Sequence, residues 1–197
     1  MKKLAQLKMR LARGPVSARE MRQSAIPSSL ASLLVRRGEA VRSSRGTYVS
    51  PATGFSALAD YETLSLKIPQ GVFALQSALR LHELTDENPH EICMAIRHGF
   101  HAPVSSGLPV NFIYRTEPSF SSEVMEMESS GVKLRVYGLE QTIADCFQYR
   151  NKIGLDVAVA ALKEAVRKNR IDIVRLWKAA TRCRVTKILR PYLEAMV

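Results

Sequence analysis

Residues 15–50 of the chain, PVSAREMRQSAIPSSLASLLVRRGEAVRSSRGTYVS, decide how the rest of the sequence is interpreted. Ser17 followed by Glu20 is a capping box, in which each side chain satisfies a backbone N–H at the start of a helix. The pattern predicts a short helix of about two turns from Ala18. This helix must end before Pro27, because a proline disfavours helical geometry in the residue that precedes it.

A second helix is predicted from Pro27 to Arg37. Pro27 suits the first turn, since the N–H that it lacks is not needed there. The apolar residues of the segment recur at helical spacing and predict one buried face: Leu30, Leu33 and Leu34. Gly38 is placed to end the helix in the left-handed conformation.

Two short strands, Glu39–Arg42 and Thr47–Ser50, are predicted around a basic turn that contains Arg45. A helix at Lys2–Ala12, with leucines at helical spacing, would pack beneath the two helices that follow. Helix, turn, helix and basic hairpin together are typical of a winged helix-turn-helix, whose usual partner is double-stranded DNA.

Positive charge is concentrated in the first quarter of the sequence. The 197 residues have a formal net charge of +11, and residues 1–50 hold 11 lysines and arginines against two glutamates. Residues 51–150 have a net charge of −5, and residues 151–197 one of +7. This distribution favours contact between the N-terminal part and phosphates.

The predicted DNA contacts come from both helices and from the hairpin. The second helix would enter the major groove, and Arg36 is expected to read the sequence, because an arginine can bind guanine through two hydrogen bonds. The hairpin arginines would reach phosphates or the minor groove. The predicted DNA-binding residues are Arg19, Ser28, Ser29, Ser32, Arg36, Arg37, Arg42 and Arg45.

Residues 55–197 are predicted to form a second domain, mixed α/β and ending in a helical bundle, so that the whole chain belongs to the α+β class. Residues 51–54 have linker character. The predicted helices of this domain are 55–67, 71–84, 139–150, 156–168, 172–182 and 185–196, with Asp156 and Asp172 as N-caps. The predicted strands are 91–96, 111–115, 132–137 and, more weakly, 123–128.

The sequence offers no motif for catalysis, so we expect neither an enzyme nor a cofactor. Phosphate-binding glycine loops and nucleophile elbows are absent. His98 and His101 lack the neighbours that a metal site needs.

No apolar run approaches the roughly 20 residues that span a bilayer. The three cysteines form no CxxC pair, which favours reduced thiols and a cytoplasmic location. A basic cluster near residues 182–190 is either a solvated helix face or a further nucleic-acid contact.

Three stretches resemble AbiEi-type proteins: RGTYVSP at 45–51, GVFALQSALRLHELTDENP at 71–89 and VYGLEQTIADCFQYRNKIGLDVAVAALKEA at 136–165. These proteins are the antitoxins and regulators of bacterial type IV, AbiE-like toxin–antitoxin operons implicated in phage defence. The resemblance implies an N-terminal domain that binds inverted repeats in its own promoter and represses the operon. It also implies a C-terminal domain that counteracts a nucleotidyltransferase-type toxin.

Several alternatives stay open at this level. Family antitoxins usually act without a stable complex with the toxin, although some relatives bind theirs, so direct contact is left undecided. Two monomers on an inverted repeat would explain repression without a dimer in solution. A module that mainly sequesters a toxin through the acidic middle segment is a competing hypothesis. The remaining alternative is a stand-alone winged-helix transcription factor with a ligand-sensing or protein-interaction C-terminal domain.

Overall fold

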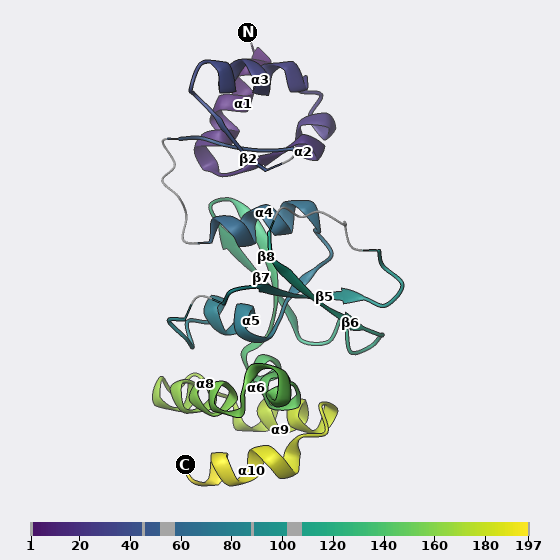
Figure 1. Cartoon of the computed structure of the whole chain (residues 1–197), viewed down its shortest axis with the longest axis vertical. Helices are drawn as coiled ribbons and strands as arrows, with labels where there is room; N and C mark the ends of the chain where they lie inside the picture. Colours follow the sequence, from purple (N-terminus) through teal and green to yellow (C-terminus); the bar gives the residue numbers. More distant parts are fainter. Residues whose placement is uncertain (1, 45, 52–57, 88, 102–107, 197) are drawn as a thin grey trace. The chain divides into compact units, whose positions relative to one another are not determined.

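The computed structural model describes all residues except 1, 45, 52–57, 88, 102–107 and 197 (Figure 1). The fold is mixed α+β, with helices and two sheets. The chain divides into two compact units. The first contains residues 1–70, 103–108 and 126–134, and the second contains residues 71–102, 109–125 and 135–197. The domain boundary at residues 51–54 stays a prediction.

The N-terminal part of the first unit alternates helices with short strands. Its elements are α1 (Lys2–Arg13), β1 (Val16–Ser17), α2 (Ala18–Gln23), α3 (Ser28–Arg36), β2 (Val41–Ser44) and β3 (Thr47–Val49). The strands form an antiparallel sheet in the order β1-β3-β2, in which β1 was not predicted. The predicted capping box is confirmed: the Glu20 N–H donates to Ser17 Oγ at 3.1 Å, and the Ser17 N–H donates to Glu20 Oε2 at 2.8 Å.

A small apolar core holds these elements together. Its buried residues are Leu7, Leu11, Val16, Met21, Ile26, Ala31, Leu34, Ala40 and Tyr48. On α3 the predicted inner face is only partly right. Leu34 is buried and Leu30 packs against the core, but Ala31 and Val35 contact the core where Leu33 was expected. Gly38 has a φ of +71°, which confirms the left-handed end of this helix. Further along the first unit, α4 (Ala59–Lys67) begins later than predicted, and residues 55–57 lie outside the described residues.

A five-stranded mixed sheet has the order β6-β5-β4-β8-β7. Its strands are β4 (Val72–Phe73), β5 (Ile92–Arg97), β6 (Val110–Arg115), β7 (Val124–Ser129) and β8 (Val132–Tyr137). β4 pairs antiparallel with β5 and parallel with β8, and β6 pairs parallel with β5. All four predicted strands are present, including the weaker one at 123–128. β6 is an edge strand of this sheet.

The predicted single helix at 71–84 is wrong. Val72 and Phe73 form the central strand β4, and only Leu75–Leu81 is helical (α5). A short apolar run does not distinguish a buried strand from a buried helix by its periodicity, and here the sheet decides. The Ala74 N–H donates to the Cys93 carbonyl at 3.0 Å. A Cβ at Gly71 would collide with the Met94 side chain, so a larger residue there would require that side chain to shift.

The C-terminal part of the second unit is a layer of helices in which α6 is central (Figure 1). The elements are α6 (Leu139–Gln148), α7 (Arg150–Ile153), α8 (Leu155–Arg167), α9 (Ile173–Arg182) and α10 (Thr186–Glu194). α6 contacts α5, α8, α9 and α10. Asp172 is confirmed as an N-cap, since its Oδ1 accepts from the Arg175 N–H at 3.0 Å. The prediction for Asp156 is wrong, because α8 begins one residue earlier and Gly154 is its N-cap.

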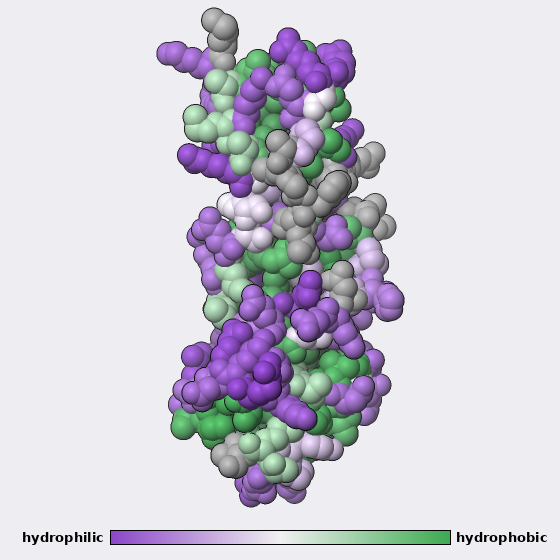
Figure 2. All heavy atoms as spheres, turned by 90° about the vertical axis from the view of Figure 1, so that its left-hand side faces the viewer, coloured by the Kyte–Doolittle hydropathy of each residue, from purple (hydrophilic) through white to green (hydrophobic). Residues whose placement is uncertain are grey.

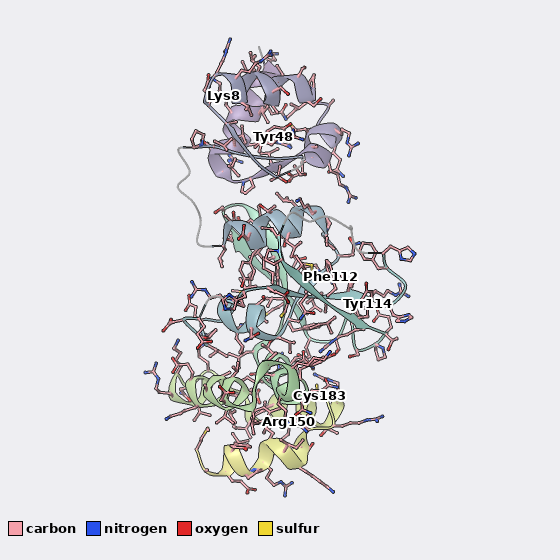
Figure 3. All side chains as sticks on the ribbon, in the orientation of Figure 1. Lys8, Tyr48, Phe112, Tyr114, Arg150 and Cys183 are labelled. Atoms are coloured by element: carbon pink, nitrogen blue, oxygen red, sulfur yellow. The ribbon has the colours of Figure 1, made fainter. Side chains whose placement is uncertain are left out.

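A buried ion pair joins the sheet to this helical layer. Arg115 of β6 donates to Asp145 Oδ1 of α6 at 2.8 Å, and the Asp145 side chain is completely buried. The same oxygen accepts from Gln141 Nε2 at 2.8 Å and from the Cys183 thiol at 3.3 Å (Cys183 is labelled in Figure 3). The Arg115 guanidinium lies 4.6 Å from the centre of the Tyr137 ring.

The charges of this pair depend on each other. Burial is the largest single influence on the pKa of Arg115 and lowers it, but the Asp145 carboxylate, together with Tyr137 and Tyr149, raises the pKa by more, so the guanidinium stays charged. Burial and the Asp145 carboxylate raise the pKa of the Cys183 thiol to about 12, which keeps that thiol protonated as a donor. Asp145 Oδ2 is buried and has no hydrogen-bond partner among the described residues. Loss of either charge would therefore leave the other buried and unpaired.

We predict that Asp145→Asn lowers the free energy of unfolding by about 3–5 kcal/mol, because it leaves a buried guanidinium without its counter-ion. Chemical denaturation measures this change. Asp86→Asn, at an exposed acidic residue, is the control and should change stability by less than about 0.5 kcal/mol. The double variant Arg115→Met/Asp145→Asn should be more stable than the single one. A loss of less than about 1 kcal/mol in Asp145→Asn would contradict the prediction.

His82 is a second buried polar group of the second unit. It lies at the C-terminus of α5 with 3% of its surface exposed, and its Nε2–H donates to the Tyr137 carbonyl at 2.7 Å. Burial lowers the pKa of His82 below its usual value of 6.5, although the bond to Tyr137 opposes this shift. The folded protein therefore holds a neutral His82 at pH values where the unfolded chain binds a proton.

We predict that the free energy of unfolding falls as the pH drops below about 6.5, with a contribution from His82 of at most about 1.4 kcal/mol per pH unit. The unfolded state binds more protons in that range, so a lower pH favours it. Urea denaturation between pH 8 and pH 5 measures the slope. His82→Gln should flatten it, whereas His98→Gln, at an exposed histidine, should not. An unchanged slope in His82→Gln would exclude this group as the cause.

Candidate nucleic-acid interface

α3 presents one polar face to solvent. Ser28, Ser29, Ser32 and Arg36 are all exposed. At 3.6 residues per turn they fall within an arc of about 100°. The core-facing residues Ala31 and Leu34 lie outside that arc. The structure thus places these four predicted contact residues together on a single surface of one helix.

The other predicted contacts lie on neighbouring elements. Arg19 is exposed in the first turn of α2, Arg37 is the exposed C-cap residue of α3, and Arg42 is exposed on β2. Arg45 lies outside the described residues. The prediction missed Arg22, which is exposed one helical turn after Arg19. The signal was present in the sequence, since residues three apart on a helix share a face.

The acidic residues of this part of the chain are already engaged. Glu20 accepts hydrogen bonds within the capping box, and Glu39 forms an ion pair with Lys8 of α1. No other acidic residue occurs between residues 1 and 50. Within the described parts of the chain, none of the predicted contact arginines forms an ion pair. Their charges are therefore available to an anionic partner.

The beginning of α3 adds to the positive potential. Its N-cap residue is Pro27, which provides no side-chain hydrogen bond to the amides of the first turn, and that turn contains no acidic residue. The partial positive charge of a helix N-terminus attracts phosphate oxygens. The uncapped start of α3 and the exposed serines that follow it suit a nucleic-acid backbone.

Two features limit what this surface can do. Ser32 Oγ donates to the Ser28 carbonyl at 3.4 Å, so part of its hydrogen-bonding capacity is used within the helix. Lys3 donates to the Ser24 carbonyl at 2.9 Å, and Lys8 forms an ion pair with Glu39, so these two lysines of α1 are engaged within this part of the chain. On the face drawn in Figure 2, hydrophilic side chains are prominent over the helices of residues 1–50, with apolar ones between them.

The C-terminal basic cluster is partly engaged in the second unit. Arg182 donates to Gln141 Oε1 at 2.9 Å and lies near Glu123, and Arg190 lies 5.7 Å from the centre of the Trp177 ring. Among the described residues there is no cluster of three or more histidines, cysteines or acidic residues able to hold a metal ion. Nor does any helix in those residues combine the length and apolar character needed to cross a membrane.

Comparisons with known proteins place the fold but not the function. No family model matches the sequence, and no curated protein matches it. Among solved structures, the chain is similar to the Rv2827c protein from Mycobacterium tuberculosis, with a TM-score of 0.61 and 14% sequence identity. The match covers 92% of this chain and 72% of that chain. At this identity the likeness shows the fold alone.

On the expectation from the sequence that Arg36 reads guanine, we predict that Arg36→Ala weakens binding to a duplex from the protein's own promoter by about 1–3 kcal/mol, because that contact would be lost. Arg42→Ala should weaken binding to all duplexes and reduce the slope of log K against log salt by about 0.9. Gel shift and fluorescence anisotropy at several salt concentrations measure both effects. Lys163→Ala, which removes an exposed charge from α8, is the control. Equal binding by wild type and Arg36→Ala would remove Arg36 from the interface.

Proposed function

We propose that this protein is a DNA-binding autorepressor whose first 50 residues form a winged helix-turn-helix. The single observation that carries the proposal is the set of exposed arginines and serines on α2, α3 and β2 whose local acids are all engaged. In this proposal α3 enters the major groove, and the hairpin of β2 and β3 contacts the backbone beside it.

The order of elements supports this proposal. Helix, strand, two helices and a two-stranded hairpin follow one another, and β1 pairs with β3 to complete a three-stranded sheet. This order is typical of a winged helix. The turn between α2 and α3 is closed by the Ile26 N–H, which donates to the Met21 carbonyl at 2.8 Å. A fixed turn holds the recognition helix at one angle to the helix before it.

The second part of the proposal is that the protein is the antitoxin of a bacterial toxin–antitoxin operon, in which it counteracts a nucleotidyltransferase-type toxin. Its support is the resemblance of residues 45–51, 71–89 and 136–165 to AbiEi-type proteins. In the proposed arrangement, two copies bind inverted repeats in the promoter and repress the operon. The second unit supplies the antitoxin activity.

A stand-alone transcription factor with a ligand-sensing or protein-interaction domain is the alternative. One observation favours it: the second unit contains a pocket of about 830 Å³ lined by residues of α5, β5, β6 and α7. A volume of this size is within the usual range for ligand sites. The two proposals differ in whether a toxin gene lies beside this one.

We predict that the full-length protein represses a reporter fused to its own promoter and rescues growth when the adjacent nucleotidyltransferase-type gene is expressed. Arg36→Ala/Arg37→Ala should lose repression, because it removes two contacts to DNA, and should still rescue growth. Lys163→Ala should retain both activities. Reporter output and colony counts measure the two effects separately.

The two parts of the proposal fail in different ways. Repression that persists in the double arginine variant would exclude α3 as the DNA-reading element. A wild-type protein that gives no rescue from an active toxin would exclude the antitoxin role and favour the stand-alone transcription factor.

A further inference from the structure

The second unit has a pocket of about 830 Å³ that none of the proposed DNA contacts touches. Its floor consists of the buried residues Leu75, Cys93 and Ile113. Exposed polar side chains form its rim: Glu87, His90, Glu91, Asn111, Tyr114 and Lys152. An apolar floor with a polar rim is typical of a binding site.

The pocket reaches the outer edge of the sheet. Four consecutive residues of β6, from Asn111 to Tyr114, line it. Successive side chains of a strand point to opposite faces. On one face of the sheet, Asn111 pairs in register with Cys93, and Ile113 pairs with Ala95. On the other face, Phe112 pairs with Met94, and Tyr114 pairs with Ile96. A space that reaches the outer edge of β6 contacts both sets of residues (Figure 3 labels Phe112 and Tyr114).

The backbone along this edge has hydrogen-bonding groups to offer. The Pro109 carbonyl accepts from the Ile92 N–H of β5 at 2.9 Å, and the Arg115 carbonyl accepts at 2.7 Å from the N–H of His98, the residue directly after β5. Backbone groups alternate in direction along a strand, so those of Asn111 and Ile113 also face β5, and those of Phe112 and Tyr114 point outward. In the sheet formed by the described residues, no strand pairs with this outer edge.

The electrostatic character of the pocket favours a cation. Glu87 and Glu91 line it against a single lysine, Lys152, whose ammonium group lies 5.7 Å from the centre of the Tyr149 ring. The negative potential reaches the floor. The pKa of the Cys93 thiol is raised to about 11, first by burial and then by the Glu91 carboxylate. Tyr114, which is 55% exposed, adds an aromatic surface to which a cation can bind.

We propose that the edge of β6 and this pocket bind an extended, lysine- or arginine-bearing segment of a partner protein. The segment adds as a new strand beside β6 and hydrogen-bonds to the outward groups of Phe112 and Tyr114. One of its basic side chains enters the pocket beside Glu87 and Glu91. The outward backbone groups provide the strand contact, and the two carboxylates select a basic side chain over an acidic one. The inference stands apart from the proposed function, since it uses no residue of the DNA interface.

The test uses the full-length protein and a fluorescein-labelled peptide of about nine residues in which threonine, valine and lysine alternate. We expect saturable binding by fluorescence anisotropy and shifts in the amide resonances of Phe112 and Tyr114. A peptide with glutamate in place of lysine should bind at least tenfold more weakly. Glu87→Gln/Glu91→Gln should weaken binding of the lysine peptide about tenfold, and the nearby Asp86→Asn should leave it unchanged.

The strand contact is tested separately from the charge. Tyr114→Pro removes one outward N–H and leaves the backbone groups that face β5, so this variant should weaken peptide binding at least tenfold. Tyr114→Thr keeps the N–H and is the control, which should weaken peptide binding about threefold or less. A peptide N-methylated at alternate residues makes the same test without altering the protein, and it should not bind. Equal binding of the lysine and glutamate peptides, undiminished binding of the N-methylated peptide, or no saturable binding at all would overturn the proposal.

Discussion

The buried pair of Arg115 and Asp145 is the constraint on which the second unit depends. It connects an edge strand of the sheet to the central helix of the helical layer, and Gln141 and Cys183 donate to the same carboxylate oxygen. A buried charge is tolerated only when its counter-ion and hydrogen-bond partners are in place, so the pair fixes how β6 and α6 lie against each other. Because β6 also forms the wall of the pocket, the geometry of the proposed peptide site follows from the same interaction.

A different balance of charges operates in the N-terminal part of the chain. There the acidic residues serve the fold: Glu20 closes the start of α2, and Glu39 pairs with Lys8. The exposed arginines of α2, α3 and β2 are left with their full charge at the surface. In the second unit the acids have the opposite effect, since Glu87 and Glu91 give the pocket a negative rim. Our proposals for the two surfaces therefore call for partners of opposite charge.

Much of the fold could be predicted where a local rule acts within a few residues. The capping box at Ser17 and Glu20, the left-handed Gly38 and the N-cap at Asp172 were all confirmed, because each depends on short-range hydrogen bonds or backbone sterics. The prediction failed at β4, where the apolar run is short and pairing with distant strands decides the conformation. The exposed arc of α3 was predictable from helical spacing, whereas Arg22 was overlooked although the same spacing applies.

The sequence by itself determined the α+β class, the boundaries of most helices and the surplus of positive charge in the first 50 residues. It did so because capping, periodicity and composition are local properties of the chain. Only the tertiary structure decided that Val72 and Phe73 form a central strand and that Asp145 meets Arg115. It also decided that residues of α5, β5, β6 and α7 enclose one pocket. These features join residues far apart in the chain, and their positions depend on strand order and helix packing, which no short stretch of sequence specifies.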